Sequence, residues 1–362
     1  MKKRTWIITS NSFPNGMAAT YRIFCFAKAL KERGYCVTVI CPKNIELLKG
    51  KRLFYFGKEK DIFYTILFNF RFNYIIKYFV KFCSSFFIYF YSIIYHRRYD
   101  VLWIYGTSIS MRVFFFPIIK LLKKKIVLEI NEFPNATKIN SESNYNSILM
   151  NLQKRITFDI VFKFVDGFTV ISHNLYKLIL DHRSTAKVLL LPILTEIFYS
   201  HRYKNTIINK EPYIFHAGTL SPQKDGIFEV FEAYSIAASE LINKNINLRF
   251  IVTNKQTKIE YWNRIQSILK SSQLENNLTI TGYLSKVNLI KHLIHSEVLL
   301  INKPTNLQNI YNFPTKISDY LLSSTPLVVA AENLELNRFL RHRVNAYVLK
   351  PNDINGMANA II

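Results

Sequence analysis

"YNFPTKISDYLLSSTPLVVA", residues 311–330, begins like a helix and ends like a buried strand. Pro314 suits the first turn of a helix, because its missing N–H and fixed φ cost nothing there. Residues 326–330 form a short apolar run rich in valine, which is typical of an interior strand of a parallel sheet. A helix that leads directly into such a strand is the repeating unit of an α/β fold.

The same alternation of short apolar strands and amphipathic helices runs through the rest of the chain. The first half predicts strands at 5–9, 36–41, 101–105, 126–130, 168–171 and 188–191, and the second half at 213–217, 248–253, 278–281, 297–301, 326–330 and 346–349. A polar stretch over 196–211 separates the two runs. The pattern predicts two tandem doubly wound Rossmann-like domains, residues 1–195 and 212–362, facing a central cleft. Ligands of such sheets bind outside the carboxyl ends of the strands, so the loops after strands are the place to look for chemistry.

Composition limits the class of protein. Hydrophobic residues make up 49% and charged residues 20% of the 362 residues, which is typical of a folded globular chain. The start of the chain lacks the apolar run of a signal peptide, and no stretch of about 20 uncharged apolar residues follows. The four cysteines show no CxxC pair, as expected for reduced thiols in a cytoplasmic protein.

The net charge is large and positive, because 48 Lys and Arg stand against 24 Asp and Glu, a difference of +24. Such a field attracts nucleic acid, an acidic membrane surface or phosphorylated substrates. Within residues 63–98 every charged residue is Lys or Arg, and most of the others are aromatic or aliphatic. We interpret this segment as a helix in a membrane interface, which places the protein peripherally at the inner face of the cell membrane. The alternative is a buried helix of the first domain whose lysines reach to solvent.

Three loops after predicted strands carry residues suited to a ligand. Gly16 follows the first strand, and Gly218 and Lys224 follow the first strand of the second half. Lys316 and Asp319 follow Pro314, one helical turn apart. Backbone donors and lysines suit a diphosphate, and an aspartate suits two ribose hydroxyls, so together these loops predict a nucleotide sugar. Taken singly, each loop could equally be an ordinary turn, a surface lysine or an ion pair on a helix.

Four stretches carry a resemblance to a known family: "FPNGMAATYRIFCFAKALKERGYCVTVI" (13–40), "FVDGFTVISHNLYKLIL" (164–180), "HAGTLSPQKDG" (216–226) and the stretch 311–330. The chain resembles the retaining glycosyltransferases of the GT-B fold, in family four, the "group 1" glycosyltransferases. The resemblance covers nearly the whole chain. It implies sugar transfer with retention of the anomeric configuration, without a cofactor or a metal ion, and the chain has no D-x-D motif.

The resemblance also implies roles for particular residues. Lys224 matches the lysine that binds the donor diphosphate, Lys316 shares that work, and Gly16 and Gly218 match loop glycines near the phosphates. Asp319 matches the acid that binds the donor ribose, while Tyr311 replaces the first acid of that motif and Thr219 replaces a frequent arginine. His173 and His216 lie near predicted strand ends, so with Tyr311 they are candidate donor contacts; Thr219 and Pro314 belong to the donor loops.

Two glutamates occur in "LEINEFPN", residues 128–135, after a strand of the first domain. Strand alternation sends Glu129 to one face of the sheet. Glu132 in the loop is therefore the candidate catalytic residue on the acceptor side; the alternative is a role in stabilising the loop.

These patterns predict a cytoplasmic glycosyltransferase that moves a sugar from a nucleotide sugar to a glycan acceptor, lipid-linked, for capsule, O-antigen or other surface polysaccharide. One alternative is a catalytically impaired homologue that acts as a binding or scaffold subunit. Tyr311, Thr219 and the lack of the family's long closing helix after residue 362 favour it. The other alternative is a basic nucleic-acid-binding protein, against which stands the lack of any nucleic-acid-binding motif.

Overall fold

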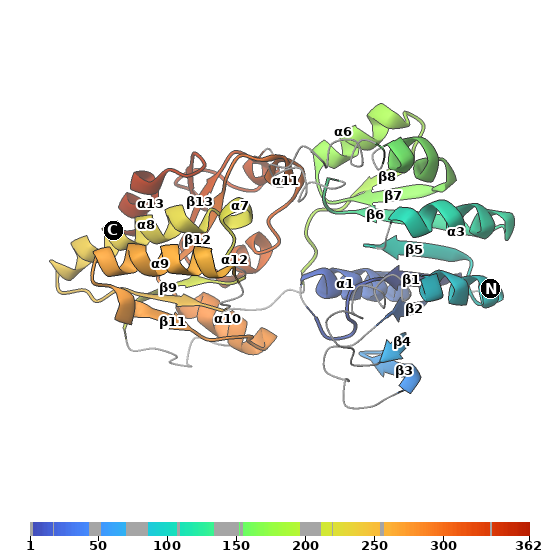
Figure 1. Cartoon of the computed structure of the whole chain (residues 1–362), viewed down its shortest axis with the longest axis horizontal. Coiled ribbons are helices and arrows are strands. Elements are labelled where there is room, and N and C mark those ends of the chain that lie inside the picture. The colour runs from blue at the N-terminus through green and yellow to red at the C-terminus, as the bar shows by residue number, and fades with distance from the viewer. Residues whose placement is uncertain are drawn as a thin grey trace. The chain divides into compact units, whose positions relative to one another are not determined.

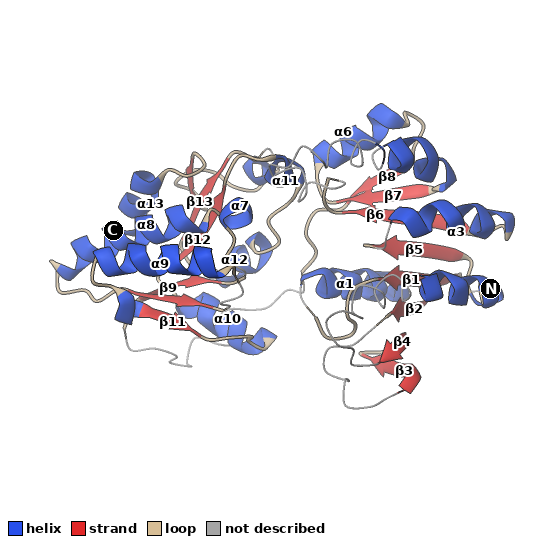
Figure 2. Ribbon diagram, in the orientation of Figure 1, coloured by secondary structure: helices blue, strands red, loops and turns tan. Residues whose placement is uncertain are grey.

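The contacts of the chain divide it into two units, residues 1–195 and 196–362 (Figure 1). The computed structural model describes residues 3–16, 18–42, 52–69, 86–106, 109–133, 152, 155–195, 211–218, 220–253, 257–333 and 335–362. Each unit is a sheet with helices packed on its faces (Figure 2).

The N-terminal unit is built on an eight-stranded sheet in the order β3-β4-β2-β1-β5-β6-β7-β8. The strands are β1 (Arg4–Thr9), β2 (Cys36–Cys41), β3 (Arg52–Glu59), β4 (Ile62–Asn69), β5 (Val101–Tyr105), β6 (Lys125–Ile130), β7 (Gly167–Val170) and β8 (Val188–Leu190). All neighbours pair in parallel except β3, which is antiparallel to β4. The strand order reverses its direction between β1 and β5, so the switch point of the sheet lies between these two neighbouring strands.

Helices cover this sheet because they alternate with its strands along the chain. They are α1 (Ala18–Glu32), helical residues 86–94, α3 (Ile109–Leu121) and α6 (His173–His182), with short helical turns at His96–Arg98, Ile156–Ile160 and Val161–Phe164. Helix α1 buries Ile23, Phe26 and Ala27, and the Phe26 ring lies 4.5 Å from the Trp103 ring of β5. The helix ends at Glu32, and Gly34, with a positive φ of 84°, turns the chain after it.

The C-terminal unit is built on a six-stranded parallel sheet in the order β11-β10-β9-β12-β13-β14. Its strands are β9 (Tyr213–His216), β10 (Arg249–Val252), β11 (Leu278–Ile280), β12 (Val298–Lys303), β13 (Leu327–Ala331) and β14 (Tyr347–Leu349). Its helices are α7 (Pro222–Asp225), α8 (Ile227–Ile242), α9 (Ile259–Ser271), α10 (Lys286–His295), α11 (Leu307–Tyr311), α12 (Ile317–Ser323) and α13 (Ile354–Ile361), with turns at Glu275–Asn277 and Leu336–Arg338.

The core of the C-terminal unit centres on α8. Phe231 and Tyr234 are fully buried against Phe250 of β10, with ring centres 4.8 and 5.0 Å apart, and the Tyr234 hydroxyl donates to the Leu248 carbonyl. The first strand of the unit, β9, lies beside the fourth, β12, so the switch point of this sheet is between them. Burying α8 against the sheet fixes the loop that joins β9 to it.

Two local expectations are wrong. Helix α12 begins at Ile317, and Pro314 stands before it, where its carbonyl accepts from the Ile317 N–H. Residues 63–69 are not helical but lie in strand β4, which pairs with β3 in an antiparallel hairpin. Of the remaining predicted interface segment, residues 86–94 are helical and residues 70–85 lie outside the described residues.

Candidate functional site

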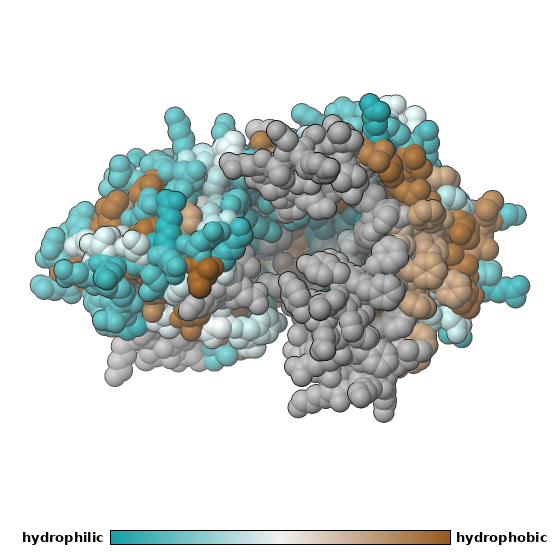
Figure 3. Space-filling model, viewed as in Figure 1, coloured by the Kyte–Doolittle hydropathy of each residue, from teal (hydrophilic) through white to brown (hydrophobic). Residues whose placement is uncertain are grey.

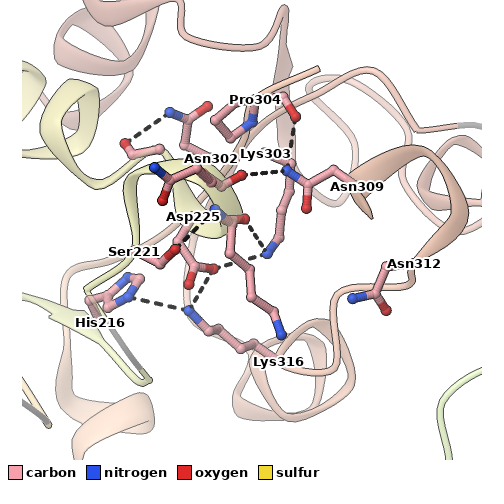
Figure 4. Close-up of polar contacts among 12 residues, drawn as sticks. His216, Ser221, Asp225, Asn302, Lys303, Pro304, Asn309, Asn312 and Lys316 are labelled. Atoms are coloured by element: carbon pink, nitrogen blue, oxygen red, sulfur yellow. Dashed lines mark hydrogen bonds and ion pairs between the residues drawn. The ribbon is translucent and has the colours of Figure 1, made fainter. Parts of the chain in front are cut away.

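Charged side chains gather at the carboxyl edge of the C-terminal sheet, at its switch point. His216 is the last residue of β9 and Lys303 is the last residue of β12. Asp225 ends the short helix α7, and Lys316 directly precedes α12. Figure 4 shows these four side chains pointing toward one another. The switch point of a doubly wound sheet is where ligands bind, so this cluster is the candidate donor site.

Asp225 holds the cluster together. Its Oδ1 atom accepts from Lys303 Nζ at 2.9 Å and from Lys316 Nζ at 3.1 Å. Lys316 Nζ also lies 3.2 Å from His216 Nε2, and Lys303 Nζ donates to the Lys224 carbonyl at 2.9 Å. Asp225 and Lys303 are buried, so each needs these partners. The bridging role of Asp225 was not predicted from the sequence, and Lys303 was not named at all. The available signal for Lys303 was its place as a lysine at the end of an apolar strand.

The electrostatics of the cluster follow from burial and from the excess of lysine. Burial by itself would raise the pKa of Asp225, but the charges of Lys316 and Lys303 outweigh it and hold that pKa well below its usual range. Burial lowers the pKa of Lys316 to about 8, against the attraction of Asp225. The positive charges of Lys303 and, less strongly, Lys224 add to this lowering. Two lysines therefore contact one carboxylate, and the charge of Lys224 acts on one of them, which leaves the cluster positive.

Gly218 brings the backbone against Lys316. Its φ is +129°, a conformation that side chains rarely adopt, and a Cβ there would stand 2.9 Å from Lys316 Cε and 3.0 Å from Nζ. The Gly218 N–H donates to Thr253 Oγ1 at 2.9 Å. The loop is further held by the Ala217 N–H, which donates to the buried Tyr320 hydroxyl at 3.2 Å. The predicted neighbour Thr219 lies outside the described residues.

Asparagine side chains fix the loop that carries Lys224. Ser221 caps α7 by accepting from the Lys224 N–H, and Asn302 donates to the Gly226 carbonyl at 3.0 Å. A Cβ on Gly226 would stand 2.1 Å from Asn302 Nδ2, so only glycine fits this approach. Asn309 donates to the Gln223 carbonyl at 3.2 Å. The loop is therefore rigid in the part that presents its lysine.

Asp319 lies in the first turn of α12 and pairs with a residue that sequence reasoning did not name. Both of its carboxylate oxygens accept from Lys286 Nζ at 2.8 Å. Its side chain keeps 20% of its exposure, so solvent still reaches it. Tyr311 ends α11 and is partly exposed, and Pro314 is buried in the turn between α11 and α12.

The N-terminal unit carries the remaining candidates. Glu132 is exposed in the loop after β6, and His173 is the first residue of α6, where its ring lies 6.5 Å from that of Tyr176. Gly16 lies in the loop after β1, and a Cβ there would meet Thr20 Oγ1 at 2.1 Å. The Thr20 hydroxyl itself donates to the Ser12 carbonyl, so packing of this loop already requires the glycine.

Glu129 has a structural role that separates it from Glu132. It is buried, its Oε1 accepts from Arg22 Nε at 2.8 Å, and its Oε2 accepts from the Thr169 hydroxyl. Burial raises the pKa of Glu129, and the charge of Arg22 opposes that shift. Arg22 also donates to the carbonyls of Leu191 and Pro192, which ties α1 to the end of the unit.

Within the described ranges no three His, Cys, Asp or Glu side chains come together as a metal site would require. Among the helices that can be described, none has the length and hydrophobicity needed to cross a membrane.

Solved structures resemble the whole chain. HepE of Anabaena, in complex with UDP and glucose, matches with a TM-score of 0.68 and 14% identity over 99% of this chain and 88% of that one. Sucrose-phosphate synthase of Thermosynechococcus elongatus matches at 0.69 and 13% over 99% and 89%. The UDP-forming α,α-trehalose-phosphate synthase of Burkholderia xenovorans, with glucose-6-phosphate, matches at 0.68 and 10% over 99% and 91%. A search of curated proteins by sequence found no match.

These likenesses confirm the predicted fold class, because the similar structures are glycosyltransferases of the GT-B fold. Residues 199–362 match the model of the glycosyl transferases group 1. This match of the C-terminal unit agrees with the predicted family, and together with the similar structures it supports the predicted enzyme class, a glycosyltransferase.

Proposed function

We propose that this glycosyltransferase moves a sugar from a nucleoside diphosphate sugar to a lipid-linked glycan, in the synthesis of a surface polysaccharide such as capsule or O-antigen. The donor part rests on one observation, the cluster at the switch point in which Lys303 and Lys316 contact Asp225 and the charge of Lys224 acts on Lys316. With its lysines charged, the cluster exceeds its carboxylate by two positive charges, which complements a diphosphate. HepE, which shares the fold, is described with UDP, with UDP and glucose, and with UDP-glucose.

In this proposal the lysines act on the leaving group. Lys224 and Lys316 neutralise the charge that develops on the departing nucleoside diphosphate, an electrostatic contribution that commonly dominates catalysis. Gly218 lets the backbone approach the phosphates, and Asp319 accepts from the ribose hydroxyls. His216, fixed beside Lys316, is a candidate donor contact. The reaction retains the anomeric configuration and needs no metal ion, as the family resemblance implies.

The acceptor part rests on the N-terminal unit. Glu132 is exposed in a loop at the carboxyl end of β6, where a carboxylate can accept a proton from an acceptor hydroxyl. His173 of this unit and Tyr311 of the C-terminal unit remain candidate contacts of the donor. The basic and aromatic composition of residues 63–98 supports a lipid-linked acceptor and a position at the inner face of the cell membrane.

A panel of UDP-, GDP- and other nucleotide sugars tests the proposal by donor binding and by hydrolysis or transfer. We expect one donor to turn over, and we expect Lys224→Ala and Lys316→Met each to reduce turnover about 100-fold or more. Lys270→Ala, an exposed lysine of α9, is the matched control and keeps the wild-type rate. Wild-type turnover in Lys224→Ala would remove the donor site. Donor binding without turnover on any acceptor would instead identify a binding or scaffold subunit.

A further inference from the structure

Helix α3 has exposed apolar side chains on the face turned away from its sheet. Phe114, Ile118 and Leu121 follow one another at intervals of four and three residues and are 69%, 40% and 81% exposed. The opposite face buries Phe115, Phe116 and Ile119 in the unit. The helix is therefore apolar on both sides, whereas a surface helix normally turns polar residues to water.

A second helical segment extends this surface. In residues 86–94 the exposed side chains include Phe86, Phe87, Phe90 and Ile94, each between 41% and 55% exposed. This segment packs beside α3, because the Phe86 ring lies 5.4 Å from the Phe115 ring and the Tyr89 ring stacks on Phe115 at 5.1 Å. Figure 3 shows hydrophobic residues gathered along the side of this unit that carries α3. We call Phe86, Phe87, Phe90, Ile94, Phe114, Ile118 and Leu121 the apolar face.

Positive side chains stand at one end of the apolar face. Arg97 and Arg98 follow helical residues 86–94, Lys123 and Lys125 follow α3, and all four are exposed. The two segments lie side by side, since Lys124 Nζ donates to the Tyr99 carbonyl at 2.7 Å and the Lys125 N–H to the Asp100 carbonyl at 3.2 Å.

The acids of this region do not balance that charge. Asp100 is paired with Arg4, and Asp166 is paired with Lys120 of α3. Within the described ranges, none of Arg97, Arg98, Lys123 and Lys125 forms an ion pair. This end of the apolar face is therefore strongly positive.

We infer that the apolar face, together with Arg97, Arg98, Lys123 and Lys125, docks on the surface of an anionic lipid bilayer. Aromatic and aliphatic side chains enter the boundary of headgroups and acyl chains, while arginine and lysine at their edge meet lipid phosphates. A second copy of the chain is a poorer occupant, because a symmetric contact would bring the same cations together. The inference deepens the proposed function, on which it rests, by assigning the surface that brings the enzyme to a lipid-linked acceptor.

Vesicle flotation of the full chain tests the apolar part of this inference. The vesicles are phosphatidylcholine alone, or phosphatidylcholine with about 30% phosphatidylglycerol. We expect binding to the anionic vesicles, and a loss of about tenfold or more in the partition coefficient when α3 is made polar. That variant is F114S/I118S/L121S, and its matched control in the C-terminal unit, with similar exposed fractions, is I242S/I259S/V344S. Equal binding by the two triple variants would overturn the inference.

The charged part is tested in the same assay. Each cation at an anionic surface contributes about fivefold to binding, so removing four of them should reduce it on the order of several hundredfold. The variant is R97Q/R98Q/K123Q/K125Q, and the control, which removes four exposed cations elsewhere, is R33Q/K270Q/R341Q/K350Q. Equal binding to neutral and anionic vesicles would overturn the choice of an anionic bilayer. A concentration-dependent dimer that disappears in the α3 variant, without vesicle binding, would identify a second copy as the occupant.

Donor hydrolysis in solution separates failure of this inference from failure of the proposed function. The α3 variant touches none of the donor residues, so it should hydrolyse the donor at the wild-type rate while it loses vesicle binding. Vesicle binding without any donor turnover would leave the docking surface standing and remove the enzyme proposal. Donor turnover without vesicle binding would leave the enzyme proposal standing and remove the docking surface.

Discussion

Replacing Asp225 with asparagine should weaken the C-terminal unit far more than an ordinary ion pair would suggest. Asp225 Oδ1 lies 2.9 Å from Lys303 Nζ and 3.1 Å from Lys316 Nζ, and the exposed fractions of the three side chains are 5%, 8% and 17%. At an effective dielectric constant of about 20, one unit-charge pair at this separation attracts by roughly 5 kcal/mol before desolvation is counted. Removing one partner of a buried pair costs about 3–5 kcal/mol, because the remaining charge stays buried. We expect that loss in the free energy of unfolding of this unit.

The same change should act on the donor site. Asp225 attracts the proton of Lys316, whose pKa burial has already lowered to about 8. Without the carboxylate that pKa falls further, so Lys316 becomes neutral near pH 7.5 and loses its attraction for phosphate. Nucleoside diphosphate binding should therefore weaken and recover as the pH is lowered.

Hydrogen exchange of the amides of β9 and β12, read by mass spectrometry, reports the stability of this unit separately from the other. Glu240→Gln is the matched control. It removes a carboxylate that is 3.0 Å from Lys244, but both side chains are about half exposed, so the expected loss is below about 1 kcal/mol. If Asp225→Asn lowered protection no more than Glu240→Gln does, the reasoning from a buried three-membered cluster would be refuted.

The remaining predictions concern titration, backbone approach and the N-terminal core. Lys316 has a pKa of about 8 in the folded chain and an ordinary value of 10.5, so the unfolded chain binds more protons between these pH values. The free energy of unfolding, measured by urea titration, should therefore rise by about 3 kcal/mol from pH 8 to 10.5. The Lys316→Met variant should not show this rise. Gly218→Ala places a Cβ 2.9 Å from Lys316 Cε and should weaken nucleoside diphosphate binding about tenfold, as measured by calorimetry. The control is Gly34→Ala, which also has a positive φ but has nothing within 4 Å of its Cβ, and it should leave this binding unchanged. Arg22→Met leaves Glu129 buried without its cation and should lower the free energy of unfolding by about 3–5 kcal/mol in chemical denaturation. Adding Glu129→Gln should recover part of this loss. An unchanged denaturation midpoint in Arg22→Met would contradict the prediction.

Some features were readable because local sequence determines them. The twelve strands predicted from alternating apolar runs all occur, since a parallel sheet buried on both faces needs short apolar strands with helices between them. Strand alternation likewise placed Glu129 on one face of the sheet and Glu132 in the loop, and the structure adds that Glu129 is buried and Glu132 exposed. The β3–β4 hairpin was missed because its turn contains no glycine: Lys60 and Asp61 themselves adopt positive φ, so the usual hairpin signal is absent.

The sequence by itself determined the two α/β units, the order of their elements and the loops that carry Gly218, Lys224 and Lys316. Only the tertiary structure decided what those residues contact. Asp225 meets Lys303 and Lys316 across 78 and 91 residues of chain, and Asp319 meets Lys286 across 33. Such pairs leave no mark on local periodicity, because they arise from the parallel packing of distant strands, which brings their carboxyl ends to one edge of a sheet.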